Sequence, residues 1–341
     1  MKHAPAIVAA VFCLALRGAA QLIPASPPLA DPADTRFEKV TEDWTSPTLS
    51  KSHLYPVPPI SSGAGEYGSY TLEMVRVQWR WGDPIDLYVI KPKGAKKPPV
   101  ILYLYGYPAE TDRFRNRSFQ QAVTKDGFAA VGFVSALTGH RYHDRPLKQW
   151  FVSELQESLA VSAHDVQMIL DYLATRGDFD MDRVGMFAQD SGASIAILAS
   201  AVDPRIKVLD AVDPWGDWPD WLATSPAVPE KERAAYLKPE FLKKVASLDP
   251  MVWLPRMQTK RFRLQEALFA PTTPKAIKEK LQASANAVSG RATVVLYQTP
   301  EDTKAVIAGD KVLDWVKHEL QTLAPPERSE QLVQHSEQEK P

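Results

Sequence analysis

The chain has 341 residues, of which 45% are hydrophobic and 24% charged, a composition typical of a globular protein that buries a full core. The formal net charge of −1 gives no electrostatic basis for binding nucleic acid, and we expect no nucleic-acid partner. The single cysteine, Cys13, lies in the leader-like segment described next. Disulfides, cysteine nucleophiles and thiolate metal sites are therefore excluded from the remainder of the chain.

The first twenty residues have the pattern of a signal peptide. Lys2 provides a positive start, residues 6–16 form a short apolar run, and small residues precede Gln21. The apolar run is too short for a stable membrane anchor. We therefore predict a secreted or periplasmic protein with no stable membrane anchor after cleavage, the alternative being an uncleaved helix at a membrane surface.

Three further regions follow the leader. Residues 21–65 are rich in Pro, Ser and Asp, which predicts an irregular lead-in. Residues 66–322 contain the strand and helix patterns of one main domain. Residues 323–341 are polar and charged, and we expect a disordered tail.

Strand and helix patterns alternate along the main domain. Residues 70–79 alternate with period two, as in a half-buried edge strand, and short apolar runs follow. The expected strands are 70–79, 84–90, 100–104, 129–134, 183–187, 206–212, 261–265 and 293–297, and the expected helices are 153–175, 190–201, 274–285 and 308–320. This order predicts an α/β fold with a mostly parallel central sheet of about eight strands and helices on both faces. A Trp-rich helical insert, about 214–258, follows the sixth strand.

The run from Arg183 to Ser194, RVGMFAQDSGAS, resembles the strand–elbow–helix of the α/β-hydrolase fold. Together with residues 178–182 it is similar to the dienelactone-hydrolase and prolyl-oligopeptidase branch. The resemblance covers roughly residues 70–320. It implies a nucleophile at a strained turn, a catalytic acid after the next-to-last strand and a His after the last strand.

Two residues compete for the tip of that turn. The resemblance requires small residues two positions before and two positions after the tip. With Asp190 at the tip these are Ala188 and Gly192, whereas with Ser191 at the tip one of them is the bulky Gln189. The steric comparison favours Asp190 at the nucleophile position.

The other two positions implied by the resemblance also hold unexpected residues. Phe269 or Ala270 stands where relatives carry an Asp, and neither can orient an imidazole. The His position after the last strand falls on Asp302 or a neighbour, and no His lies between His164 and His318. The sequence thus predicts a degenerate triad formed by Asp190 or Ser191, a non-acid, and Asp302.

The turn after the third expected strand is the counterpart of the oxyanion loop. Gly106 permits close backbone approach, and backbone N–H groups of Tyr107 and Ser191 are candidates for an anion-binding pair. A plain strand-end turn is the alternative. Ligand-cleft candidates are Tyr105, Arg113, Trp215 and Trp218, which otherwise would be core or solvated loop residues.

Relocated bases are the remaining route to catalysis. His140 and His143 follow a predicted strand at the edge where sites of parallel sheets gather. They could supply a general base, bind a metal, or serve a structural role, but no third distant ligand is evident, and we predict neither metal nor cofactor. We interpret His164 as a packed, hydrogen-bonded helix residue and His318 as a surface residue.

The sequence therefore supports three hypotheses. The first is an exported hydrolase relative without Ser-His-Asp chemistry that binds a small molecule or peptide at the elbow. The second is an active hydrolase of esters, amides or alkyl halides, using Asp190 or Ser191 with a relocated base. The third is a purely structural exported domain.

Overall fold

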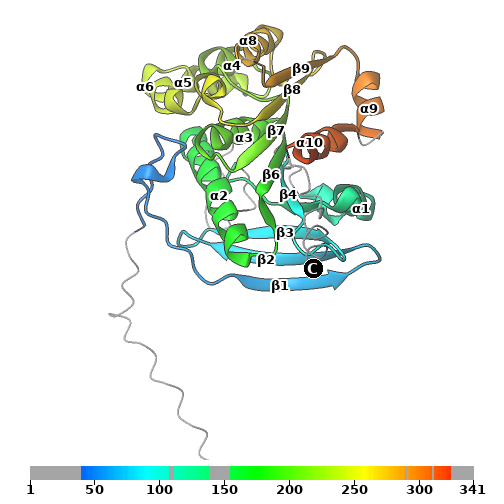
Figure 1. Cartoon of the computed structure of the whole chain (residues 1–341). Coiled ribbons are helices and arrows are strands. Elements are labelled where there is room, and N and C mark those ends of the chain that lie inside the picture. The colour runs from blue at the N-terminus through cyan, green and yellow to red at the C-terminus, as the bar shows by residue number, and fades with distance from the viewer. Residues whose placement is uncertain are drawn as a thin grey trace, which may run out of the picture. The chain divides into compact units, whose positions relative to one another are not determined.

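The computed structural model describes residues 40–106, 111–137, 141, 154–288, 290–308 and 311–323, and Val40 onward belongs to one compact unit. Nine strands form one sheet in the order β1-β2-β3-β5-β4-β6-β7-β8-β9 (Figure 1). Their bounds are β1 Ile60–Glu66, β2 Tyr70–Gln78, β3 Pro84–Pro92, β4 Pro99–Leu104, β5 Ala129–Gly132, β6 Asp180–Gln189, β7 Ile206–Val212, β8 Arg261–Ala267 and β9 Ala292–Tyr297.

The sheet has an antiparallel part and a parallel part. Strands β1, β2 and β3 pair antiparallel with each other, and β3 also pairs antiparallel with β5. All pairs from β5 through β4 and β6 to β9 are parallel. The carboxyl ends of β6, β7 and β8 therefore meet at one edge, where sites of open parallel sheets form.

Helices cover both faces of the sheet (Figure 1). The α-helices are α1 Arg117–Thr124, α2 Leu155–Arg176, α3 Ser191–Val202, α4 Trp218–Thr224, α5 Glu230–Tyr236, α6 Pro239–Val245, α7 Pro250–Trp253, α8 Lys275–Asn286, α9 Pro300–Ala308 and α10 Lys311–Thr322. Short 3-10 turns are η1 Leu49–Lys51, η2 Asp112–Arg115, η3 Lys125–Gly127, η5 Ala246–Leu248 and η6 Leu254–Arg256.

Strand β4 shows how the two faces are built. Its side chains alternate between two hydrophobic cores, with Leu102 in the core under α2 and α3 and with Ile101 and Tyr103 in the core under α1 and α10. Every residue of β4 is buried. An uninterrupted apolar run is therefore what a central parallel strand with two covered faces requires.

The predicted architecture is confirmed, with differences at the sheet edge. Strand β1 lies almost entirely within residues 21–65, which we expected to be irregular, and it gives the sheet a ninth strand. Its sequence, ISSGAGE, is almost entirely exposed and has no hydrophobic alternation, so it carries no strand signal. The expectation of an edge strand at 70–79 was wrong, because β2 pairs with β1 on one side and β3 on the other.

The expected insert after β7 is helical, containing α4 to α7. Asp249 ties its two ends together by accepting hydrogen bonds from the backbone N–H groups of Asp217 and Trp218, both at 2.8 Å. No helix in the described ranges is long and apolar enough to cross a membrane.

Candidate functional site

Asp190 lies at the sharp bend between β6 and α3. Its backbone adopts φ 52° and ψ −122°, a region that a non-glycine residue rarely enters. Its N–H donates to the carbonyl of Val212 at 2.8 Å, which fixes the bend against the neighbouring strand. Ser191 is the first residue of α3 and is 1% exposed, whereas Asp190 is partly exposed.

Two glycines make room for this bend. A Cβ on Gly192 would lie 2.4 Å from the Leu104 carbonyl oxygen, and a Cβ on Gly106 would lie 2.8 Å from the Cβ of Asp190. Both distances are far below normal van der Waals contact. The small residue two positions after Asp190 is therefore a steric requirement of the elbow, as the sequence predicted.

A second aspartate follows the neighbouring strand. Asp213 comes directly after β7, has φ 48°, and accepts a hydrogen bond from the Ala267 N–H at 2.8 Å. The ammonium of Lys278, on α8, lies 3.6 Å from Asp213 Oδ1. Lys278 also donates to the carbonyls of Ala267 and Ala270, the latter at 2.9 Å. Its side chain is thus buried beneath the turn that follows β8.

Glu266 is the third acid of this region. Its side chain is fully buried on β8, and Oε2 accepts a hydrogen bond from Gln282 of α8 at 2.5 Å. Oε1 is buried and has no hydrogen-bond partner in the part of the chain that the structure describes. We call Asp190, Asp213, Glu266 and Lys278 the elbow cluster.

The elbow cluster holds protons more strongly than isolated acids do. Burial raises the pKa of Asp190 to about 7, and the charge of Asp213 adds to the shift while Gln189 and Lys278 oppose it. Burial also raises the pKa of Glu266 to about 7, opposed by the hydrogen bond from Gln282. The pKa of Asp213 rises for the same reason, although the Ala267 N–H and Lys278 favour its charged form. One ammonium does not compensate two buried carboxyl groups and a third that is partly exposed.

The predicted counterparts of the catalytic acid and His do not join this cluster. Phe269 is exposed, and the Ala270 N–H closes a turn by donating to Ala267. Asp302 is exposed in the first turn of α9, where its Oδ2 accepts hydrogen bonds from the N–H groups of Gln298 and Thr299. These bonds lower the pKa of Asp302. Asp302 therefore caps its own helix.

No histidine of the described ranges is hydrogen-bonded to Asp190. His318 is exposed on α10 and His164 is fully buried in α2, as predicted for both residues. His53 pairs through its backbone with Thr41. His140 and His143, the predicted relocated bases, lie outside the described residues, as does Tyr107 of the predicted oxyanion pair.

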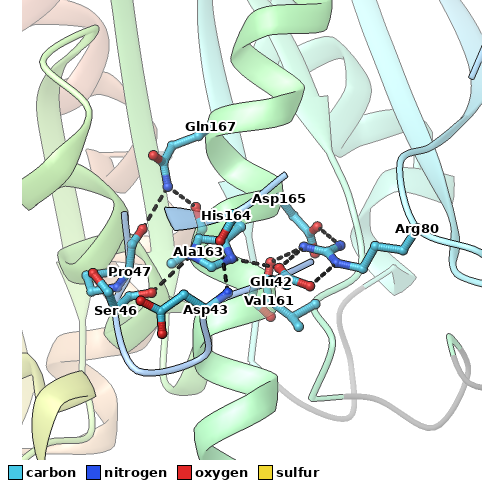
Figure 2. Close-up of polar contacts among 12 residues, drawn as sticks. Glu42, Asp43, Ser46, Pro47, Arg80, Val161, Ala163, His164, Asp165 and Gln167 are labelled. Carbon is cyan, nitrogen blue, oxygen red and sulfur yellow. Dashed lines mark hydrogen bonds and ion pairs between the residues drawn. The ribbon is translucent and has the colours of Figure 1, made fainter. Parts of the chain in front are cut away.

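His164 belongs to a buried network that attaches residues 42–47 to α2 (Figure 2). Its Nδ1 lies 2.6 Å from Glu42 Oε1, and its Nε2 lies 3.0 Å from the Ser46 carbonyl oxygen. Arg80 donates to both oxygens of Glu42, at 2.5 and 2.6 Å, and to Asp165 at 2.5 Å. Burial alone would raise the pKa of Glu42, but the bonds from His164 and Arg80 lower it to about 2.

The network continues to the turn between β2 and β3. Arg141 donates to both oxygens of Asp83 at 2.8 Å and forms an ion pair with Asp165 at 2.6 Å. The indole of Trp79 also donates to Asp165 at 2.8 Å. Every charged group here has an opposite charge within hydrogen-bond distance, which identifies the network as a structural clamp.

The four predicted ligand-cleft residues have different environments. Tyr105 is buried against Phe187, and the Arg113 guanidinium lies 4.7 Å from the centre of its ring. Arg113 also lines a surface hollow of about 430 Å³ with Asp112, Asn116, Ser118, Phe119 and Ala122.

Trp215 and Trp218 pack in the core of the insert. Trp215 is stacked on Trp221 with ring centres 4.8 Å apart, and the Trp218 indole donates to the Leu248 carbonyl at 3.2 Å. Ser194 of α3 bonds the Trp215 backbone, with Oγ 2.8 Å from both its N and its O. The described part of the chain contains no group of three or more His, Cys, Asp or Glu side chains spaced to hold a metal ion.

Several solved structures have a similar fold. The acetyl xylan esterase of Paenibacillus sp. R4 superimposes with a TM-score of 0.58 at 18% identity, over 76% of this chain and 89% of that one. Acetyl xylan esterase 1 of Thermoanaerobacterium sp. JW/SL YS485 gives 0.60 at 16% identity, over 77% and 88%. The acylaminoacyl peptidase of Pyrococcus horikoshii gives 0.57 at 12% identity, over 75% and 42%. The chain has the α/β-hydrolase fold.

Sequence comparison adds a weaker likeness. YtaP of Bacillus subtilis (strain 168), a protein whose name describes it as a hydrolase, is 25% identical to this chain over 138 residues, which are 36% of this chain. The match spans 45% of that protein's length. No family model matches the chain.

Of the four residues of the elbow cluster, the sequence predicted only Asp190 as a site residue. Asp213 directly follows a predicted parallel strand, and this position alone could have placed it beside Asp190. Lys278 gave no usable signal, since a lysine on a surface helix is normally solvated. Glu266 lies within β8, three residues before Phe269, the predicted counterpart of the catalytic acid.

Proposed function

We propose that this chain is an exported protein of hydrolase ancestry that binds a small molecule or peptide at the elbow without Ser-His-Asp chemistry. The observation that carries the proposal is the residue at the bend. Asp190 occupies it, while the adjacent Ser191 is buried as the first residue of α3.

The requirements of serine catalysis support this proposal. Serine catalysis needs an exposed hydroxyl, a base within hydrogen-bond reach and a group that orients the base. Ser191 is 1% exposed, and Asp302, at the position where a His is expected, caps α9. A single missing member lowers the rate by orders of magnitude.

The partial exposure of Asp190 supports a second candidate, an active hydrolase with an aspartate nucleophile. Its carboxylate oxygen would attack an alkyl carbon and expel a halide or another leaving group as an anion, forming an ester. Water activated by a relocated base, His140 or His143, would then hydrolyse the ester and release an alcohol.

A serine-directed fluorophosphonate probe separates the proposal from ordinary serine catalysis. We expect no labelling of the purified mature protein and no turnover of an ester panel. Labelling or turnover that disappears in Ser191→Ala would overturn the proposal. The Ser200→Ala variant, which changes another buried serine of α3, is the matched control.

Single turnover in ¹⁸O-labelled water tests the second candidate. An aspartate nucleophile incorporates ¹⁸O into its own carboxyl group, and mass spectrometry of the peptide containing Asp190 detects the label. Haloalkane or ester turnover with this label would replace the binding proposal by the aspartate mechanism. Turnover lost in only one of the variants His140→Ala and His143→Ala would identify that residue as the base.

Export is tested by N-terminal sequencing of the protein recovered outside the cytoplasm of an expressing bacterium. The expected mature start is Gln21. Recovery only from the cytoplasm, with Met1 or Lys2 at the start, would contradict export.

A further inference from the structure

The elbow cluster has an excess of carboxyl groups over cations. Lys278 is its one cation, and its ammonium is already directed at Asp213 and at the carbonyls of Ala267 and Ala270. Neither Asp190 nor Glu266 forms an ion pair with any residue of the described ranges. Fully ionised, the cluster has a net charge of −2, and burying that charge without a partner is unfavourable.

A second observation shows unsatisfied polarity in the same place. The Glu266 side chain is 0% exposed, and its Oε1 has no hydrogen-bond partner among the described residues, although it lies within electrostatic range of both Asp213 and Lys278. Buried polar atoms without a partner are rare in folded proteins. Asp190, at the accessible end of the cluster, is partly exposed and can be reached by a ligand.

From this geometry we propose that the elbow recognises a ligand with a protonated amine, whose ammonium pairs with Asp190 and Asp213. The inference rests on the proposed binding function and names the ligand class. An organic cation fits better than a metal ion, because no three acids of the described ranges are spaced to coordinate one. The ammonium supplies the donors and the positive charge that the cluster lacks.

The amine displaces protons when it binds. Burial raises the pKa values of Asp190 and Glu266 to about 7, so near neutral pH the free cluster is partly protonated. A bound cation favours the charged carboxylates, and protons are therefore released. Among the described residues, the groups that face this site are Asp190 from the elbow, Gln189 at the end of β6, Asp213 after β7, Glu266 from β8, and Lys278 and Gln282 from α8. Affinity should consequently rise between about pH 6 and pH 8, while an alkylamine keeps its own proton until about pH 10.

Calorimetric titration of the mature protein tests the inference with cyclohexylmethylamine and its neutral analogue cyclohexylmethanol. We expect the amine to bind at least about tenfold more tightly than the alcohol at pH 7.5. The binding enthalpy should differ between phosphate and cacodylate, two buffers that contain no amine and differ in ionisation enthalpy, reporting proton release. Asp190→Asn and Asp213→Asn should each weaken amine binding at least about tenfold, with Asp86→Asn, an exposed acid paired with Arg76, as the unchanged control.

The outcomes separate this inference from the function on which it rests. If the alcohol binds as tightly as the amine and Asp190→Asn weakens both, the elbow binds ligands but the amine class is wrong. Amine binding that Asp190→Asn and Asp213→Asn leave unchanged, or no binding of either compound, also overturns the inference. Fluorophosphonate labelling of Ser191 would instead remove the proposed function. Circular dichroism of each variant verifies that it is folded.

Discussion

Asp190 and Asp213 directly follow neighbouring parallel strands, and both have a positive φ, 52° and 48°. The Asp190 N–H donates to Val212, the residue that precedes Asp213, so the two bends are fixed to each other. Both carboxyl groups are thereby held at the carboxyl edge of the sheet, where Lys278 and Glu266 complete the cluster. This arrangement leads to predictions about pH, stability and steric tolerance.

Stability should fall as the pH rises from about 5 to 7. The folded protein retains protons on Asp190 and Glu266, whose pKa values are raised to about 7, whereas the unfolded chain releases them near their ordinary values. Groups with a raised carboxyl pKa stabilise the fold at low pH, and this contribution is lost as the pH approaches the folded value. Each contributes a slope of at most about 1.4 kcal/mol per pH unit to the free energy of unfolding.

Urea unfolding across this pH range measures that slope. Glu266→Gln should flatten it, because the amide does not titrate and nearly preserves the shape of the side chain. Asp86→Asn, which removes an exposed acid, should leave it unchanged. An unaltered slope in Glu266→Gln would show that Glu266 is ionised in the fold at both ends of the range.

Lys278 should be important for stability although it is a lysine on a surface helix. Lys278→Met leaves two backbone carbonyls without this donor and Asp213 without its ion-pair partner, and we expect a loss of about 2–4 kcal/mol in the free energy of unfolding. Lys280 lies on the same helix, half exposed, and pairs with Asp217 and Asp220 at the surface. Lys280→Met should cost much less than Lys278→Met, because solvent screens the surface ion pairs of Lys280. Equal costs in chemical denaturation would contradict the role given to Lys278.

The sequence predicted the layers better than the edges and the polar contacts. Ile101 and its neighbours in β4 carry enough local hydrophobicity to predict a buried parallel strand. Strand β1 has no local hydrophobic pattern, because both its faces are exposed and its pairing with β2 determines its structure. Asp190 could be placed at the bend because a steric rule links it to residues nearby in sequence.

Contacts between residues distant in sequence could not be predicted in this way. Glu42 and His164 are 122 residues apart, and no local pattern connects a carboxylate in an irregular segment with an imidazole on a buried helix. Likewise, Lys278 reaches Asp213 only because α8 packs beside the ends of β7 and β8. Such partners follow from the fold and cannot be deduced before it.

The clamp around Arg80 should be a major stabilising element. Arg80→Met leaves Glu42 and Asp165 as buried charges with fewer partners, and we expect a cost of about 3–5 kcal/mol. Arg76, on β2, lies in an exposed pair with Asp86, and Arg76→Met should cost less than about 1 kcal/mol. The two variants remove the same chemical group, so the difference in their denaturation midpoints reports burial. A similar small effect for both would mean that the clamp contributes little to stability.

Gly192 should be the least replaceable glycine of the elbow. An alanine Cβ there would lie 2.4 Å from the Leu104 carbonyl oxygen, a backbone atom that cannot turn away, so α3 or β4 must shift. We expect Gly192→Ala to destabilise the fold by about 1–3 kcal/mol or more, and to perturb ligand binding at Asp190. Gly63→Ala, where the new methyl group meets no atom within 4 Å, is the control. Its change in the free energy of unfolding should stay within about 0.5 kcal/mol. If Gly192→Ala were equally silent, the bend at Asp190 would not depend on this close approach.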